Sequence, residues 1–221
     1  MKSLHRAPEL VPYQDEPKQL PSGAPGKNGL LRLGFELRGE RTVLAHLERC
    51  VPLLVQQALY FDEEMPDLPC VIMISTSGGV LQGDRYTVGI NLAAGTQAHI
   101  TTQSATKIQE MDANYALQSQ EVVLGEHAYL EYLPAPVIPY KNSRFLTHTR
   151  VTIPPSATLL YSEILLPGRK YYRQGERFEY NLFSSLVCAQ RPDGQEIFSE
   201  KFVIEPQRRE KAGAKGFQND V

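Results

Sequence analysis

The feature that most constrains the fold of this chain is a weak internal repeat near its middle. Three segments share it: LAAGTQAHITTQ (92–103), VVLGEHAYLEYL (122–133) and VTIPPSATLLYS (151–162). An alanine recurs about every thirty residues, preceded three positions earlier by Gly or Pro and followed two positions later by an apolar residue. In a stacked β architecture each layer buries its apolar face against its neighbours. A strand, a tight turn, a small inward residue and a second strand therefore recur there at a fixed period. The repeat predicts a mainly β, β-helix-like (solenoid-type) single domain with few short helices, and the hairpins of an ordinary β-sandwich are the alternative.

A shared register would also align side chains beyond the alanines. It places Ser104, Pro134 and Glu163 in one column, and Glu110, Tyr140 and Arg169 in another. Glu163 stands in an otherwise apolar strand, where a carboxylate costs several kcal/mol unless it is paired or used. We therefore expect Glu163 either to pair with Arg169 or to face a polar interior channel.

Composition divides the chain into three parts. Residues 1–29 are rich in Pro, Gly and charge, which predicts a flexible N-terminal tail, and 30–206 carry the strand pattern of the domain. Residues 207–221 are polar and predict a loose C-terminal tail. Within the domain, Pro52 interrupts a run with helical spacing and favours an extended or turning path there, with a helix as the alternative.

Charge and cysteine usage favour a cytoplasmic protein. A net charge of -2 gives no field that would attract nucleic acid or an anionic membrane, so neither partner is expected. The chain has no apolar run long enough to span a membrane and no secretory signal. Its three cysteines, Cys50, Cys70 and Cys188, lack CxxC spacing, which predicts buried free thiols in a reducing cytosol.

Glycines gather in STSGGVLQGDRYTV, but no known phosphate loop fits them. A P-loop needs GxxxxGK followed by Ser or Thr, and a dinucleotide fingerprint needs GxGxxG opening a helix. Gly78, Gly79 and Gly83 are better explained by a backbone path that a Cβ would block. Asp84 follows this loop as a turn or capping residue, or as a ligand.

No pattern in the sequence indicates an enzyme. Ser104 in ITTQSATKIQ lacks a GxSxG elbow and has no neighbouring histidine, which disfavours a hydrolase. The five histidines show neither HxxxH nor HxH spacing, so no permanent metal site is expected. The residues alone therefore indicate a soluble, mostly-β domain with an internal repeat, and leave a β interaction module or, less favoured, a hydrolase as its possible functions.

Three segments carry a resemblance to a known family: SGGVLQGDRYTVGINLAAGTQAHITTQSATKI, LEYLPAPVIPYKNSRF and SEILLPGRKYYRQGERF. In this order and spacing the chain resembles the urease accessory protein UreD (UreH) family over roughly residues 30–206. The resemblance implies a non-catalytic scaffold for urease maturation that binds the urease apoprotein on one side and UreF on the other, with UreG reached through UreF. Nickel released by the GTPase UreG would then cross an internal tunnel to the urease active site, in transit and without a permanently bound cofactor.

The resemblance also assigns roles to individual residues. The positions that would line or shape the nickel route are Asp84, Gln103, Ser104, Lys107, Glu163, Arg169 and Glu176, and the motif glycines are Gly78, Gly79, Gly83 and Gly168. Asp84, Glu163 and Glu176 would contact Ni²⁺ transiently. Sparse oxygen ligands suit a cargo that must be released, because a conduit needs sites that admit an ion without trapping it.

Two departures from the family pattern stand out. Gln109 occupies a place after Ile108 where members usually carry an aromatic residue. Members of the family also continue for several tens of residues beyond the strand that ends near Ile204, whereas this chain continues as QRREKAGAKGFQNDV, so the resemblance implies that the family's C-terminal region is missing here.

Overall fold

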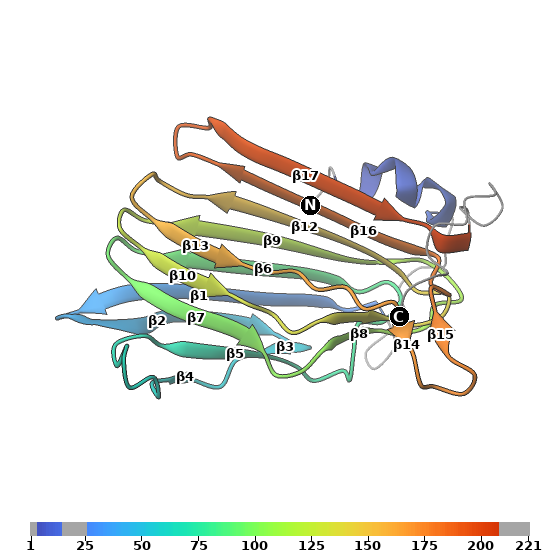
Figure 1. Cartoon of the computed structure of the whole chain (residues 1–221), viewed down its shortest axis with the longest axis horizontal. Helices are drawn as coiled ribbons and strands as arrows, with labels where there is room; N and C mark the ends of the chain where they lie inside the picture. Colours follow the sequence, from blue (N-terminus) through green and yellow to red (C-terminus); the bar gives the residue numbers. More distant parts are fainter. Residues whose placement is uncertain (1–3, 15–25, 208–221) are drawn as a thin grey trace.

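The structure is a computed structural model that describes residues 4–14 and 26–207 (Figure 1). Strands dominate this part of the chain, and its helical elements are two short 3-10 helices, η1 (Leu4–Arg6) and η2 (Pro8–Tyr13). The prediction of a mainly β domain is confirmed. A solenoid as such is not, because the strands are organised as two large sheets with two small ribbons beside them.

The larger sheet has seven strands. In spatial order they are β17 (Glu196–Ile204), β16 (Leu182–Gln190), β12 (Arg144–Thr152), β9 (Ala116–Leu124), β6 (Arg85–Leu92), β1 (Asn28–Arg38) and β2 (Arg41–Cys50). The central strands pair in parallel, whereas β2 and β17 close the two ends as antiparallel hairpin partners.

The second sheet packs face to face against the first (Figure 1). Its strands are β13 (Thr158–Tyr161), β10 (Tyr129–Tyr132), β7 (Gln97–Thr102), β5 (Cys70–Ser75) and β3 (Leu53–Leu54), with β4 (Ala58–Leu59) also beside β5. The ribbons are β8 (Thr106–Ile108) with β11 (Val137–Pro139), and β14 (Gly168–Arg169) with β15 (Glu176–Arg177).

The internal repeat corresponds to successive passes of the chain through these sheets. One pass runs through β6, β7 and β8, the next through β9, β10 and β11, and the third through β12 and β13. On the β13 side, Leu130 of β10 pairs with Leu159, as the repeat predicts. On the β7 side it pairs with Ala98, whereas the repeat predicts Ile100. The first segment is thus displaced by two residues, a shift that keeps every side chain on the same face because the strand period is two.

The core lies between the two sheets. The large sheet contributes Leu31, Leu33, Phe35, Val88, Ile90, Leu92 and Val122, and the second sheet contributes Val71, Ala98, Ile100, Leu130 and Tyr132. All of these side chains are buried, and each large apolar one contributes about 1.5–3 kcal/mol. The alternation of buried and less buried residues along β6 matches the period of two that the sequence shows.

Part of the predicted N-terminal tail is packed against the body. Leu10 of η2 is fully buried and joins a cluster with Leu117 and Leu146 of the large sheet. The carboxylate of Glu9 accepts a hydrogen bond from Ser184 Oγ at 2.7 Å. Residues 4–14 therefore differ from the flexible tail that the sequence predicts, because one apolar face of a short helix suffices to anchor them. Residues 1–3, 15–25 and 208–221, including nearly all of the predicted C-terminal tail, lie outside the described residues.

Three smaller expectations can be compared with the structure. Val51 and Pro52 lie in a turn between β2 and β3 and no helix forms there, which agrees with the predicted extended or turning path. Cys70 is buried, but Cys50 is exposed and Cys188 is half-buried, so the prediction of three buried thiols is wrong, and all three are free. Within residues 4–14 and 26–207, no helix has the length and apolar character needed to cross a membrane.

Candidate functional site

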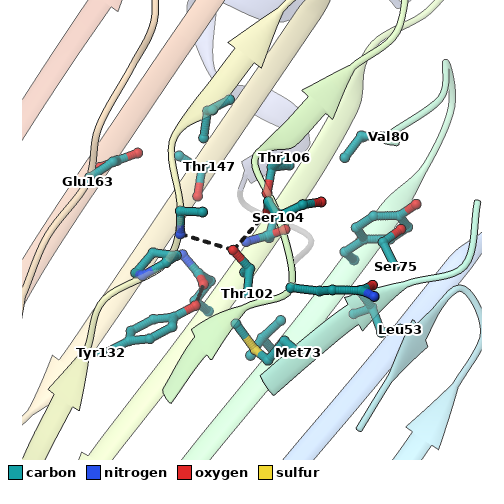
Figure 2. A pocket seen from close by; sticks show the side chains of 18 of the residues that line it. Leu53, Met73, Ser75, Val80, Thr102, Ser104, Thr106, Tyr132, Thr147 and Glu163 are labelled. Carbon is teal, nitrogen blue, oxygen red and sulfur yellow. Dashed lines mark hydrogen bonds between the residues drawn. The ribbon is translucent and has the colours of Figure 1, made fainter. Parts of the chain in front are cut away.

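A cavity of about 120 Å³ lies between the two sheets (Figure 2). The large sheet lines it with Tyr86, Val88, Gln118, Gln120, Phe145 and Thr147, and the opposite wall includes Met73, Ser75, Thr102, Gln103, Ser104, Thr106, Pro134 and Ala135. Glu163 contributes a carboxylate to the lining. The space is roomy enough for several water molecules, and its wall offers them polar partners.

The floor of this cavity carries a polar row that crosses four parallel strands. Tyr86, Gln118, Thr147 and Ser185 lie directly opposite one another on β6, β9, β12 and β16. We call these four residues the interior polar row. Because neighbouring strands are about 4.8 Å apart, the row is roughly 14 Å long. It runs perpendicular to the strands through the interior of the protein.

Apolar residues border the row on one side, and a second polar pair borders it on the other. On the first side lie Ala116, Phe145 and Phe183, which are all buried. On the second side, Gln120 Nε2 donates to Thr149 Oγ1 at 2.8 Å.

Two tyrosines, the buried Tyr132 and the half-buried Tyr161, complete the polar network around Gln120. Tyr132 OH donates to Gln120 Oε1, and Tyr161 OH lies 3.4 Å from Thr149 Oγ1. Burial raises the pKa of Tyr161 to about 12 and the pKa of Tyr132 further, so both phenols stay neutral. Every named polar group of this network thus has a partner, which fixes the wall of the cavity.

Glu163 stands at the β16 end of the polar row. Ser185 Oγ donates to Glu163 Oε2 at 2.8 Å. Burial raises the pKa of the Glu163 carboxyl, the Ser185 hydrogen bond opposes this in part, and the nearby Glu200 carboxylate raises it further. A cation in the cavity would relieve this cost of ionising Glu163.

The expected ion pair between Glu163 and Arg169 does not form. Arg169 donates from Nε and Nη2 to both carboxylate oxygens of Glu176, each at 2.6 Å. Its guanidinium lies between the rings of Tyr140 and Tyr172, 3.8 and 3.7 Å from their centroids. Arg169 and Glu176 therefore fasten the base of the β14–β15 ribbon, and neither lines the cavity.

Asp84 is fully buried at the opposite end of the row. Its Oδ1 accepts from the Lys27 backbone N–H at 2.8 Å, and its Oδ2 accepts from the Leu81 N–H at 2.8 Å and from Tyr86 OH at 2.6 Å. The carboxylate thus closes the glycine loop and fastens the start of β1 to it. Through the Tyr86 hydroxyl it also touches the interior polar row.

Gln103 and Ser104 stand at the mouth of the cavity, which they line while being exposed to solvent. Behind them, Thr102 Oγ1 donates to the Ser104 carbonyl at 3.0 Å and accepts from the Ala135 N–H at 2.9 Å, which holds this rim in place (Figure 2). Lys107 is exposed and does not line the cavity; its backbone carbonyl accepts from Val80 N–H at 2.8 Å.

The motif glycines adopt backbone conformations that favour glycine. Gly78, Gly79, Gly83 and Gly168 have φ of 70°, 152°, 76° and 128°. At Gly79 a Cβ would lie 2.7 Å from the Lys107 carbonyl oxygen, and at Gly168 it would lie 2.0 Å from that of Glu176. Gln109, the departure from the family pattern, donates from Nε2 to the Gly78 carbonyl at 3.3 Å and so supports the same loop.

The structure brings some of the sequence-predicted residues together and separates others. Ser104, Pro134 and Glu163, the first predicted column, all line the cavity with Gln103. In the second column Arg169 stacks on Tyr140, but Glu110 accepts a hydrogen bond from Asn142 Nδ2 at 3.0 Å instead.

The residues that sequence reasoning missed are Gln118, Gln120 and Thr147, which line the cavity, and Ser185, which continues the polar row beside Thr147. Their signal is the presence of polar residues within strand segments that begin and end with apolar residues, as in ALQSQEVVL and LFSSLV. Among residues 4–14 and 26–207, no group of three or more His, Cys, Asp or Glu side chains is placed to hold a metal ion.

Fold and site together define a β-sheet scaffold with a partly polar cavity between its two sheets. The family model for the UreD urease accessory protein matches residues 27–220. The urease accessory protein UreD 2 of Brucella ovis is 62% identical over 205 residues, which cover 93% of this chain and 68% of the relative. UreD of Yersinia pseudotuberculosis is 56% identical over 200 residues, 90% of this chain and 62% of the relative. The chain belongs to the UreD family of urease accessory proteins, and membership implies an accessory, non-catalytic role in urease maturation.

Proposed function

We propose that this chain guides nickel to urease through the passage marked by the interior polar row. The observation that carries the proposal is the interior line of Tyr86, Gln118, Thr147 and Ser185 across four strands, with Glu163 beside it. A core built only for stability would gain from apolar side chains at these positions. Successive passes of the chain place one polar residue on each of four neighbouring parallel strands.

The chemistry of the row suits a cargo ion. Amide, hydroxyl and carboxylate oxygens bind Ni²⁺ or its hydration water weakly, and no thiolate or imidazole lines the cavity to trap it. Glu163 supplies the single carboxylate of the lining, and its raised pKa reflects an environment in which a divalent ion would displace a proton. Asp84 shapes the far end of the row through Tyr86 instead of binding the ion, because its oxygens already accept three hydrogen bonds.

The partners in this proposal are the urease apoprotein, UreF, and UreG bound through UreF, all acting in the cytoplasm for nitrogen metabolism. The chain acts as a chaperone within this assembly, and nickel passes through it without being permanently bound. The runner-up is a β interaction module that assembles the complex without handling metal. A hydrolase has no support from geometry, since Ser104 bonds to no histidine among the described residues.

Glu163→Gln tests the proposal. The variant should co-purify with urease and the accessory proteins as the wild-type chain does, and the urease obtained should contain less nickel by elemental analysis. The matched control is Glu131→Gln, because Glu131 is a half-buried carboxylate that bonds to His99 and Tyr129 and lies away from this cavity. An intact complex with full nickel content in Glu163→Gln would favour the interaction module.

A further inference from the structure

The β14–β15 ribbon carries a hairpin tip, residues 170–175, that extends past the ends of the two large sheets (Figure 1). The tip has the sequence KYYRQG. It lies apart from the cavity, so the nickel route does not account for it. The structure of the hairpin base and the chemistry of the exposed side chains indicate its role.

The base of this hairpin is rigid. Arg169 and Glu176 are joined by two hydrogen bonds at 2.6 Å, and their side chains are only 21% and 12% exposed. Gly175 N–H donates to the Tyr172 carbonyl at 2.7 Å and closes the turn, in which Arg173 and Gly175 both have positive φ. A loop held in this way loses little conformational entropy on binding.

The tip presents an aromatic ring surrounded by positive charge. Tyr171 is 88% exposed, and the Lys170 ammonium lies 5.4 Å from its ring centroid. Lys170, Arg173 and Arg177 form no ion pair with any residue of the described chain. Tyrosine and arginine on a preorganised loop are the residue types that dominate protein interfaces.

We infer that this hairpin is the docking element by which the chain binds a protein partner with an acidic surface. Tyr171 inserts into an apolar depression of that partner, and Lys170, Arg173 and Arg177 meet carboxylates at its rim. Charge complementarity is the argument for this occupant, since the three cations are uncompensated in a chain whose net charge is -2. The inference rests on the proposed function in one respect: the partner is a component of the urease-maturation complex.

The test compares three variants of the full chain, each co-expressed with the urease subunits and the other accessory proteins. Lys170→Glu with Arg173→Glu reverses the tip charge, Tyr171→Ala removes the anchor, and Phe61→Ala is the control. Phe61 is a suitable control because it is 66% exposed but precedes the acidic run DEEMPD. Folding of each variant is checked by circular dichroism.

We expect both hairpin variants to weaken direct binding of one component by at least about tenfold, with UreG lost together with UreF where UreF is that component, and Phe61→Ala to change nothing. Wild-type affinity for that component should fall as salt rises. Unchanged binding of every component by both hairpin variants would overturn the inference and leave the nickel route standing. If the variants instead lose only self-association, or only binding to anionic vesicles, the occupant is a second copy or a membrane and the inference is wrong. Failure of the wild-type chain to bind any component would refute the proposed function itself.

Discussion

Replacing Asp84 by Ala should destabilise the whole fold, because its carboxylate is a structural centre. The change leaves two backbone N–H groups and the Tyr86 hydroxyl without their acceptor at a position that is 1% exposed. A buried donor that loses its partner costs about 1–3 kcal/mol, and the three donors share one site. We therefore expect the free energy of unfolding to fall by about 3–5 kcal/mol, a large part of a typical domain's stability.

Urea unfolding of the purified chain, followed by far-ultraviolet circular dichroism, measures this change. Tyr86→Phe is the matched control, since it removes one of the three hydrogen bonds and should cost about 1 kcal/mol. Equal m-values for the three proteins would show that the same surface is exposed on unfolding. A loss below about 1 kcal/mol for Asp84→Ala would refute the structural role and return Asp84 to the candidate nickel ligands.

Other substitutions test separate parts of the structure. Gly125→Ala should cost more than about 1 kcal/mol in thermal unfolding, because the new Cβ would lie 2.5 Å from Ala94 N. Glu163 has a raised pKa in the folded state, so its ionisation opposes folding, and Glu163→Gln should gain stability relative to wild type as pH rises from 4 to 7. Glu131 has a lowered pKa because Tyr129 and His99 bond to it, so Glu131→Gln should cost stability at pH 7 and progressively less as pH falls below 4.5. Arg169→Lys should lower the melting temperature, since an ammonium cannot reproduce the two-point pairing with the carboxylate and the stacking between two tyrosines; an unchanged melting temperature would contradict that role.

The repeat allowed the β-rich fold and part of the site to be predicted from sequence. Its period placed Ser104 and Glu163 on one column, and both line the cavity. The repeat could not fix the register of the first segment, because a shift of two residues buries the same face and leaves the same apolar pattern. Local spacing also could not show that Leu10 anchors the N-terminal segment, which depends on a contact with strands more than one hundred residues away.

Ion pairs were harder to predict than strands. Glu163 and Arg169 are close in sequence and of opposite charge, but the turn between them directs Arg169 toward Glu176 and leaves Glu163 to Ser185. Which partner an arginine selects depends on backbone directions that the residue types do not encode. The polar row was missed for a related reason, since Thr147 and Ser185 become neighbours only through parallel pairing of distant strands.

Filling the cavity at the middle of the interior polar row is the sharpest test of nickel passage through this protein. Thr147 is buried there, and Thr147→Leu would place an apolar branch in the passage, whereas Thr147→Val removes the hydroxyl at nearly constant volume. The measurement is the nickel content per urease active site after maturation with each variant in an intact complex. If nickel passes by Thr147, urease nickel content should fall strongly with Thr147→Leu and less with Thr147→Val. Full nickel loading with the leucine variant would contradict passage of the ion through this interior.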